Sequence, residues 1–175
     1  MSYYYRLASV LNTLPKHWAY CDAWEWVSDE KGSYWEDRRV PGFQVFGEAS
    51  QALRALSGED MDGVYEASEY PQILIVEADE NFVSDGCSIY FALECEGVLS
   101  VRAMPSKEAL DRILEIYSQE SEQYDYDSFA EWCEDSEEEI AGFLLKMSEV
   151  IEVSFIETLP RPCLINFSES ELWVA

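Results

Sequence analysis

The apolar residues of this chain recur at two spacings, which together predict a mixture of helices and strands. Within residues 2–14 they recur every three or four positions, as on one face of a helix, and Ser2 is a suitable cap for a helix that ends at Pro15. The same spacing within residues 48–56 predicts a short helix that ends at Gly58.

Two further helices are predicted in the second half of the chain. One opens at Pro105–Ser106 and runs to about Ser118, with four side chains facing inward: Leu110, Ile113, Leu114 and Tyr117. The other begins at Ser128, because Ser128 and Glu131 have the spacing of a capping box. At 100° per residue, seven of its apolar side chains share one face: Phe129, Trp132, Cys133, Ile140, Phe143, Leu144 and Met147. A ridge of four carboxylates is predicted on the opposite face: Glu131, Glu134, Asp135 and Glu138.

Runs rich in β-branched and aromatic residues predict the strands. The clearest is QILIVEA at residues 72–78, whose continuous apolar character is typical of a buried strand. Residues 87–94 and 98–104 flank Cys95-Glu96-Gly97, which predicts a hairpin. Further strands are predicted around residues 23–27 before a turn at Gly32, and at residues 40–46, 149–157, 163–167 and 172–174. The pattern predicts an α+β fold with a mainly antiparallel sheet of about 5–6 strands and helices packed on one face.

The composition of the chain indicates a folded protein. Hydrophobic residues make up 48% of the 175 residues and aromatic residues 14%, so we expect one domain over residues 1–175. No apolar run is long enough to cross a membrane, and the N-terminus lacks the charged and apolar regions of a signal peptide. The five cysteines are odd in number and widely spaced, as is typical of thiols in a reducing compartment, so we expect a cytoplasmic protein.

The net charge of −25 is distributed unevenly along the chain. Residues 1–54 are near neutral and hold four of the six tryptophans, whereas residues 55–175 are acidic. Residues 55–101 and 113–145 each contain eleven acidic residues and no lysine or arginine. Such blocks lack local salt bridges and repel themselves, which costs stability. We therefore interpret the negative field as functional.

The residues that could carry out chemistry are few. His17 and Cys21 lie four positions apart, but nothing in their surroundings activates a nucleophile, and we interpret His17 as a surface or half-buried side chain. Asp60 and Asp62 lack the other ligands of a calcium loop, and the pattern Asp125-x-Asp127 is better explained by the start of a helix. Acids are abundant, but the bases that would stabilise phosphate charge are scarce. We expect no enzyme activity, no cofactor and no metal.

The acidic layout favours binding to a basic protein partner rather than to nucleic acid directly. Tyr124 and Tyr126 are expected to be exposed because they lie among polar residues before the Ser128 cap. Ten residues are predicted to bind the partner: Glu120, Glu122, Tyr124, Asp125, Tyr126, Asp127, Glu131, Glu134, Asp135 and Glu138. The base-free block of residues 55–101 is expected to contribute charge as well, and whether the two blocks share one face is a question that needs the structure.

Three functions are consistent with this layout. Carboxylates on successive helical turns lie about 5.4 Å apart and can imitate rows of phosphates, so the chain is interpreted first as a DNA or RNA mimic that inhibits its partner. In size and composition it resembles antirestriction and anti-CRISPR proteins encoded by phages and plasmids. The alternative is a cytosolic immunity protein that neutralises a basic, nuclease-type bacterial toxin. The third is a solvated acidic surface, as in salt-adapted proteins. The acidic residues of such proteins are mainly aspartates, whereas this chain has 25 glutamates and 11 aspartates.

Overall fold

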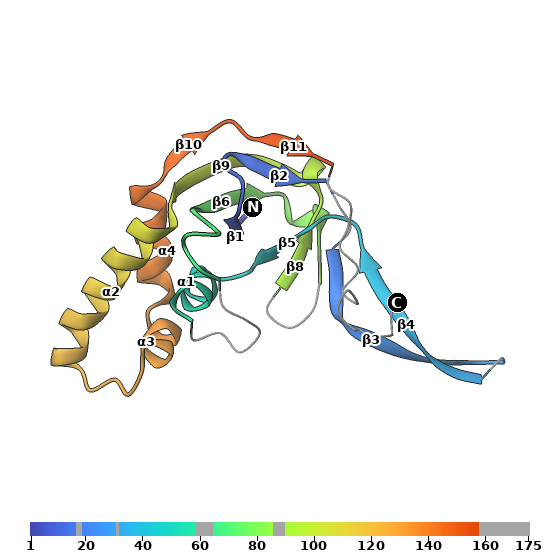
Figure 1. The fold of residues 1–175 in the computed structure, drawn as a ribbon, viewed down its shortest axis with the longest axis horizontal. Helices are drawn as coiled ribbons and strands as arrows, with labels where there is room; N and C mark the ends of the chain where they lie inside the picture. Colours follow the sequence, from blue (N-terminus) through green and yellow to red (C-terminus); the bar gives the residue numbers. More distant parts are fainter. Residues whose placement is uncertain (17–18, 31, 59–64, 86–89, 158–175) are drawn as a thin grey trace.

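An antiparallel sheet of seven strands forms the centre of the described part of the protein (Figure 1). The computed structural model describes residues 1–16, 19–30, 32–58, 65–85 and 90–157. The order of strands across the sheet is β10 (Glu149–Ile151), β9 (Val98–Pro105), β6 (Gln72–Ala78), β1 (Ser2–Ala8), β5 (Phe43–Phe46), β8 (Tyr90–Leu93) and β7 (Val83–Asp85). Together with the helices on one of its faces, the sheet confirms the predicted α+β class.

Helices cover one face of the sheet (Figure 1). They are α1 (Ala49–Ser57), α2 (Ser106–Gln123), α3 (Phe129–Asp135) and α4 (Glu137–Met147). Tyr5, Ile73 and Met104 point from the sheet into this core. The helices contribute Leu53, Ile113, Trp132, Ile140 and Leu144, all of which are buried.

A second apolar layer lies on the opposite face. There β2 (Thr13–Pro15) and β11 (Ser154–Ile156) form a parallel pair, and Leu14 and Phe155 pack against Leu74 and Val76 of the sheet. Alternate residues of a strand point to opposite faces of the sheet. Since both faces are covered by apolar layers, the side chains of β6 are buried on both faces. This explains why residues 72–78 form a continuous apolar run, as the sequence predicts.

The predicted N-terminal helix is wrong. Residues 2–8 form strand β1, which pairs with β6 from Ser2↔Ala78 to Ala8↔Gln72. Tyr4 and Ala8 pack on one face of the sheet while Tyr5 and Leu7 pack on the other. Burial on both faces removes the alternation that marks a strand, so the apolar positions of this segment imitate the spacing of a helix.

The predicted hairpin over residues 87–104 is also wrong. Residues 95–97 form a short 3-10 helix, η2 (Cys95–Gly97), and the strands on either side of it pair with different partners. Strand β8 pairs with β5 and β7, whereas β9 pairs with β6 and β10. A Cβ atom at Gly97 would lie 2.4 Å from the Cβ of Phe82 in the neighbouring 3-10 helix η1 (Glu80–Phe82). Gly97 is therefore required by this close packing rather than by a hairpin turn.

Other predicted elements are confirmed with shifted boundaries. Helix α1 ends at Gly58, whose φ of 83° is the left-handed conformation expected of a C-terminal cap. The tryptophan-rich segment forms a ribbon of β3 (Ala19–Asp29) and β4 (Gly32–Val40), which extends away from the sheet (Figure 1). The region predicted as one strand at residues 149–157 contains two, β10 and β11. The strands predicted at residues 163–167 and 172–174 lie outside the described residues.

Helix α2 is longer than predicted and carries charge along its outer face. It extends to Gln123 instead of Ser118, and Leu114, predicted to face inward, is 37% exposed.

Among the helices that the structure describes, none combines the length and the apolar composition required to cross a bilayer.

Candidate partner-binding surface

The connection between α2 and α3 lies at the end of α2 that is far from the sheet (Figure 1). It consists of Tyr124, Asp125, Tyr126 and Asp127 before the cap at Ser128. Tyr124 is 55% exposed, as predicted, and both aspartates are exposed. Tyr126 is half-buried and packs against the helix-side core, so the prediction that both tyrosines are exposed is wrong for Tyr126.

The start of α3 is held by the predicted capping residues. The Ser128 Oγ accepts a hydrogen bond of 3.1 Å from the backbone N–H of Glu131. The Glu131 carboxylate in turn accepts one of 2.7 Å from the backbone N–H of Asp127, one residue before the cap. Glu131 therefore has a local structural role in addition to its exposed charge.

The predicted carboxylate ridge does not lie on one helix. The helix expected from Ser128 to Met147 is interrupted at Ser136, which ends α3 and precedes α4. Glu131, Glu134 and Asp135 therefore belong to α3, and Glu138 belongs to the first turn of α4. Asp135 and Ser136 favour helix ends over helix interiors, because their short polar side chains compete for backbone hydrogen bonds.

Glu137 explains why the chain changes direction here. Its two carboxylate oxygens accept hydrogen bonds from the backbone N–H groups of Ala49, 2.9 Å, and Ser50, 2.8 Å. These N–H groups belong to the first turn of α1, where a helix has unpaired donors and a partial positive charge. Burial raises the pKa of the neighbouring Tyr5 to about 12, and the negative charge of Glu137 contributes to the rise. The sequence analysis assigned no such role to Glu137.

Carboxylates from α2 and α3 converge on Tyr126. Partial burial raises the pKa of its phenol, and the negative charges of Asp135, Glu120 and Glu131 raise it further. Glu120 also accepts a hydrogen bond of 3.1 Å from the indole N–H of Trp132, which is fully buried. The convergence gives these residues one location, and we call the following set the acidic tip: Glu120, Glu122, Tyr124, Asp125, Tyr126, Asp127, Glu131 and Asp135.

The other two predicted residues lie beside the acidic tip. Glu134 is directed to α1, where its carboxylate lies 3.8 Å from the guanidinium of Arg54. This partner partly neutralises its charge. Glu138 is exposed at the start of α4.

Glu139 is an acidic residue that the sequence analysis did not single out. Its pKa is raised by partial burial and by the hydrogen bond and negative charge of the neighbouring Glu120. Two carboxyl groups so close together favour the state in which one of them holds a proton. The interhelical contact between Glu120 and Glu139 has no local sequence signal, since the residues lie on α2 and α4.

The outer face of α2 adds a second row of charge. Glu108, Glu115 and Glu122 are exposed and recur every seven residues, about 10.5 Å apart along the helix. They lie opposite the buried face formed by Ala109 and Ile113. The heptad spacing was visible in the sequence, but the predicted end at Ser118 excluded Glu122 from the row.

The acidic block of residues 55–101 does not extend this surface at its 3-10 helices. Asp79, Glu80 and Glu96 lie in and beside η1 and η2, where Ala78 pairs with Val98. Helix α2 begins at the other end of the same two strands, after the pair Gln72↔Pro105. A seven-residue strand separates these ends by about 20 Å. Among the described residues, the carboxylates at these 3-10 helices therefore form an acidic region separate from the connection between α2 and α3.

The candidates for chemistry are not brought together in the described residues. His17, Asp60 and Asp62 and the side chain of Cys21 lie outside them. Among the residues that are described, no group of three or more histidine, cysteine, aspartate or glutamate side chains is placed to hold a metal ion. Burial raises the pKa of the Cys95 thiol, as does its hydrogen bond to Glu96, which disfavours the reactive thiolate.

Comparison of the chain with protein-family models, with curated proteins and with solved structures gave no match.

The role of Glu137 can be tested with its neighbour as the control. Glu137→Ala removes two hydrogen bonds to a charged acceptor and should lower the free energy of unfolding by about 2 kcal/mol, measured by urea denaturation. Glu138→Ala removes the same charge from an exposed position and should change the free energy by less than about 0.5 kcal/mol. Equal effects of the two substitutions would show that Glu137 does not hold α1.

The contact between Glu120 and Glu139 predicts a pH dependence. The pKa of Glu139 is higher in the folded protein than in the unfolded chain, so the folded state gains stability as the pH falls toward the ordinary glutamate value. Glu139→Gln mimics the protonated form and should raise the melting temperature at pH 7, more than Glu138→Gln does. The advantage should disappear below about pH 4, where the wild-type carboxyl is also protonated. An advantage that is the same at pH 7 and pH 4 would contradict this assignment.

Proposed function

We propose that this protein is an inhibitor that binds the basic nucleic-acid-binding surface of a partner protein in place of DNA or RNA. The observation that carries this proposal is the group of exposed carboxylates at the acidic tip, which includes Asp125, Asp127, Glu131 and Asp135. The exposed side chain of Tyr124 lies in the same connection. No lysine or arginine occurs between residues 113 and 145 to neutralise this field from within the segment.

The geometry supports recognition of a basic groove by long-range attraction and close contact together. The row on the outer face of α2 and the acidic tip present carboxylates from adjacent elements, which is how an assembly of helices can imitate a charged nucleic-acid backbone. A binding groove lined by lysine and arginine is complementary to such a field. Tyr124 supplies an amphipathic side chain that can contact the partner at low entropic cost. We further propose that the protein acts in the cytoplasm, without enzymatic activity of its own.

The test is capture of the partner at low salt with a charge-reversed variant. In the variant Glu122→Lys, Asp125→Lys and Asp135→Lys are combined, because these exposed positions make no hydrogen bond or ion pair to the rest of the chain that the structure assigns. We expect affinity for the captured partner to fall at least about tenfold at 50 mM salt. For the wild-type chain, affinity should fall steeply as salt is raised, and duplex DNA or guide-loaded RNA should compete with it.

A matched triple variant controls for net charge. Asp85→Lys, Glu96→Lys and Glu157→Lys make the same change in charge at exposed positions of β7, η2 and the segment after β11. This control should retain most of the affinity. The mimic proposal fails if the two triple variants weaken binding equally, or if the partner still binds nucleic acid while the protein is bound to it.

A second candidate is an immunity protein that neutralises a nuclease-type toxin. It is favoured by the distance between the acidic tip and the carboxylates at η1 and η2, because that separation leaves the acidic tip as one concentrated patch with an exposed tyrosine. This candidate predicts that co-expression rescues the growth of cells producing the toxin, and that Tyr124→Ala weakens the rescue. If rescue fails for toxins encoded beside this chain, the immunity function is excluded.

A further inference from the structure

The ribbon of β3 and β4 has two chemically different faces. Alternate residues of a strand lie on opposite faces, and residues that pair directly across two antiparallel strands lie on the same face. Three register pairs therefore share one face: Trp24↔Asp37, Trp26↔Trp35 and Ser28↔Ser33. The two pairs between them share the other face: Glu25↔Glu36 and Val27↔Tyr34. By register, one face holds three of the six tryptophans of the chain, and we call it the tryptophan face.

The tryptophan face reaches water at the end of the ribbon near the turn. The Oγ atoms of Ser28 and Ser33 lie 2.9 Å apart in a hydrogen bond, and both residues are exposed. The ribbon joins the sheet at its base, where β4 ends at Val40 and β5 begins at Phe43, and it extends away from the sheet (Figure 1). Within the described residues it is a separate sheet of two strands. Two strands alone are marginally stable, so an aromatic face of this kind needs a partner layer.

The net charge of −25 restricts where two copies of this chain can meet. Residues 1–54 contain seven acids and six bases, so almost all of the net charge lies in residues 55–175. The ribbon belongs to the near-neutral part and lies on the side of the molecule away from α2 and α3 (Figure 1). A contact between two ribbons therefore keeps the acidic tips of the two copies far apart.

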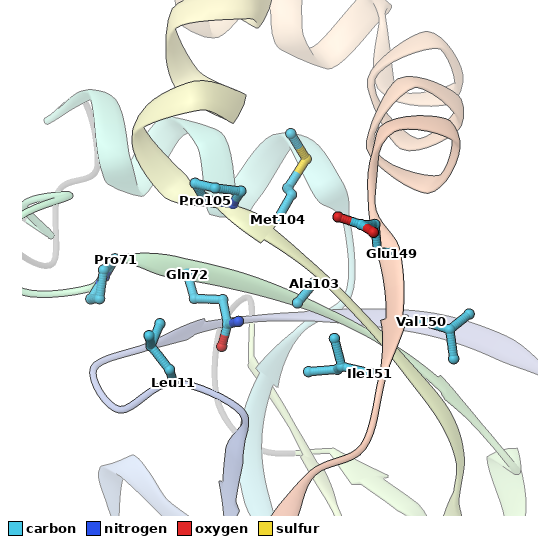
Figure 2. Close-up of a pocket in the computed structure, with 9 residues that line it drawn as sticks. All are labelled: Leu11, Pro71, Gln72, Ala103, Met104, Pro105, Glu149, Val150 and Ile151. Carbon is cyan, nitrogen blue, oxygen red and sulfur yellow. The ribbon is translucent and has the colours of Figure 1, made fainter.

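The hollow beside β10 does not offer the same opportunity to a second copy. It has a volume of about 360 Å³, lies next to the edge strand of the sheet in the described residues, and is lined by apolar residues such as Leu11, Met104 and Ile151 (Figure 2). Glu149 is exposed at its rim, so a second copy would bring the same carboxylate to this place. On the tryptophan face only one of the six register positions is charged, namely Asp37.

The two ends of the ribbon carry opposite charge. Residues 29–31 at the turn contain two acids and one base, which sum to −1. The segments at the base, residues 16–22 and 37–40, together contain two acids and three bases, which sum to +1 with His17 neutral. Two ribbons packed antiparallel place each turn beside the base of the other, so opposite charges meet. A parallel arrangement would bring like charges together.

The area of the tryptophan face is sufficient for a stable contact. A tryptophan buries roughly 150–250 Å² when it is covered, so three from each of two copies would bury about 900–1,500 Å². Specific interfaces between proteins bury roughly 1,200–2,000 Å² in total. Contacts from the flanking positions of the ribbon would add to the area of the tryptophans.

We propose that two copies of this chain associate through the tryptophan face, with their ribbons packed face to face and antiparallel about a two-fold axis. Both copies then use the same surface, as is typical of dimers with this symmetry. The other face of the ribbon, with Glu25 opposite Glu36, stays outside the contact. The dimer presents two acidic tips that point away from each other, and it can therefore engage two basic sites at once.

The first test measures the oligomeric state of the full-length chain by sedimentation equilibrium between about 1 and 200 µM, where we expect a reversible dimer. Trp26→Ser together with Trp35→Ser removes the tryptophan pair of the contact and should raise the dimer dissociation constant at least tenfold. Val27→Ser together with Tyr34→Ser is the matched control, because this pair is next in the register and lies on the other face. The control should change the dissociation constant less than threefold.

The second test exchanges charges and stays decisive if the variant without the tryptophan pair does not fold. Arg38→Glu with Arg39→Glu makes both ends of the ribbon negative, and Asp29→Lys with Glu30→Lys makes both ends positive. Each variant alone should dimerise at least fivefold more weakly than the wild type. An equimolar mixture of the two should restore association as a heterodimer, because the reversed base then meets the reversed turn.

The outcomes that overturn the proposal are specific. They are a chain that is monomeric at about 200 µM, equal weakening by the two serine pairs, and a mixture of the charge variants that associates no better than either variant alone. If the arginine-reversed chain pairs with the wild type more tightly than the wild type pairs with itself, base meets base and the antiparallel arrangement is wrong. The triple variant at the acidic tip should remain dimeric, so this inference and the proposed function can fail separately.

Discussion

The helical layer depends on the two hydrogen bonds that Glu137 accepts from the backbone N–H groups in the first turn of α1. Helix α1 contacts α2, α3 and α4, and its N-terminus presents backbone donors that need acceptors. Glu137 can reach these donors only because the chain breaks its helix at Ser136 and begins α4 in a new direction. The break in turn places Glu134 and Asp135 on α3 and Glu138 on α4. The distribution of surface charge is thus a consequence of a buried contact.

The acidic residues of this region serve two purposes that conflict. Glu131 binds the backbone of Asp127, Glu134 lies near Arg54, and Glu120 accepts the indole N–H of Trp132, so part of the charge stabilises the fold. Some of the same carboxylates also repel one another, since Glu120, Glu131 and Asp135 surround Tyr126 and Glu120 lies beside Glu139. Repulsion of this kind is compatible with a folded protein when other interactions offset it, and binding of a basic partner would remove it. The repulsion that lowers the stability of this region and the attraction to a basic partner in the proposed function therefore both come from the same carboxylates.

The sequence predicted the elements whose signals are local. Helix α1 was predicted to within one residue at each end and strand β6 with its observed bounds, because the Gly58 cap and the apolar run of residues 72–78 are local signals. Strand β1 was not, because burial of both its faces produces a pattern shared with helices. The hairpin failed for a different reason: residues 95–97 separate two strands whose partners lie far away in the sequence, and local spacing carries no information about such pairing.

The same distinction applies to the candidate site. The ten residues were predicted from the charge layout and stay a prediction, whereas the cap at Ser128 was visible as a motif and is confirmed. The half-burial of Tyr126, the use of Glu137 by α1 and the contact between Glu120 and Glu139 depend on helices that meet only in three dimensions. The exposed edge at β10 also follows from the order of strands in the sheet and not from the residues of β10 themselves.

The parallel pairing of β2 with β11 has a consequence for how the protein forms. Residues 13–15 pair with residues 154–156, far away in the sequence. Leu14 and Phe155 of this pair cover the face of the sheet opposite the helices. During synthesis this face stays open to water until residues 154–156 have been made and have paired with residues 13–15. Contacts between such distant residues slow folding and prolong the exposure of apolar surface. The net charge of −25 opposes association of such unfinished chains, because like charges repel while one side of the sheet is still uncovered.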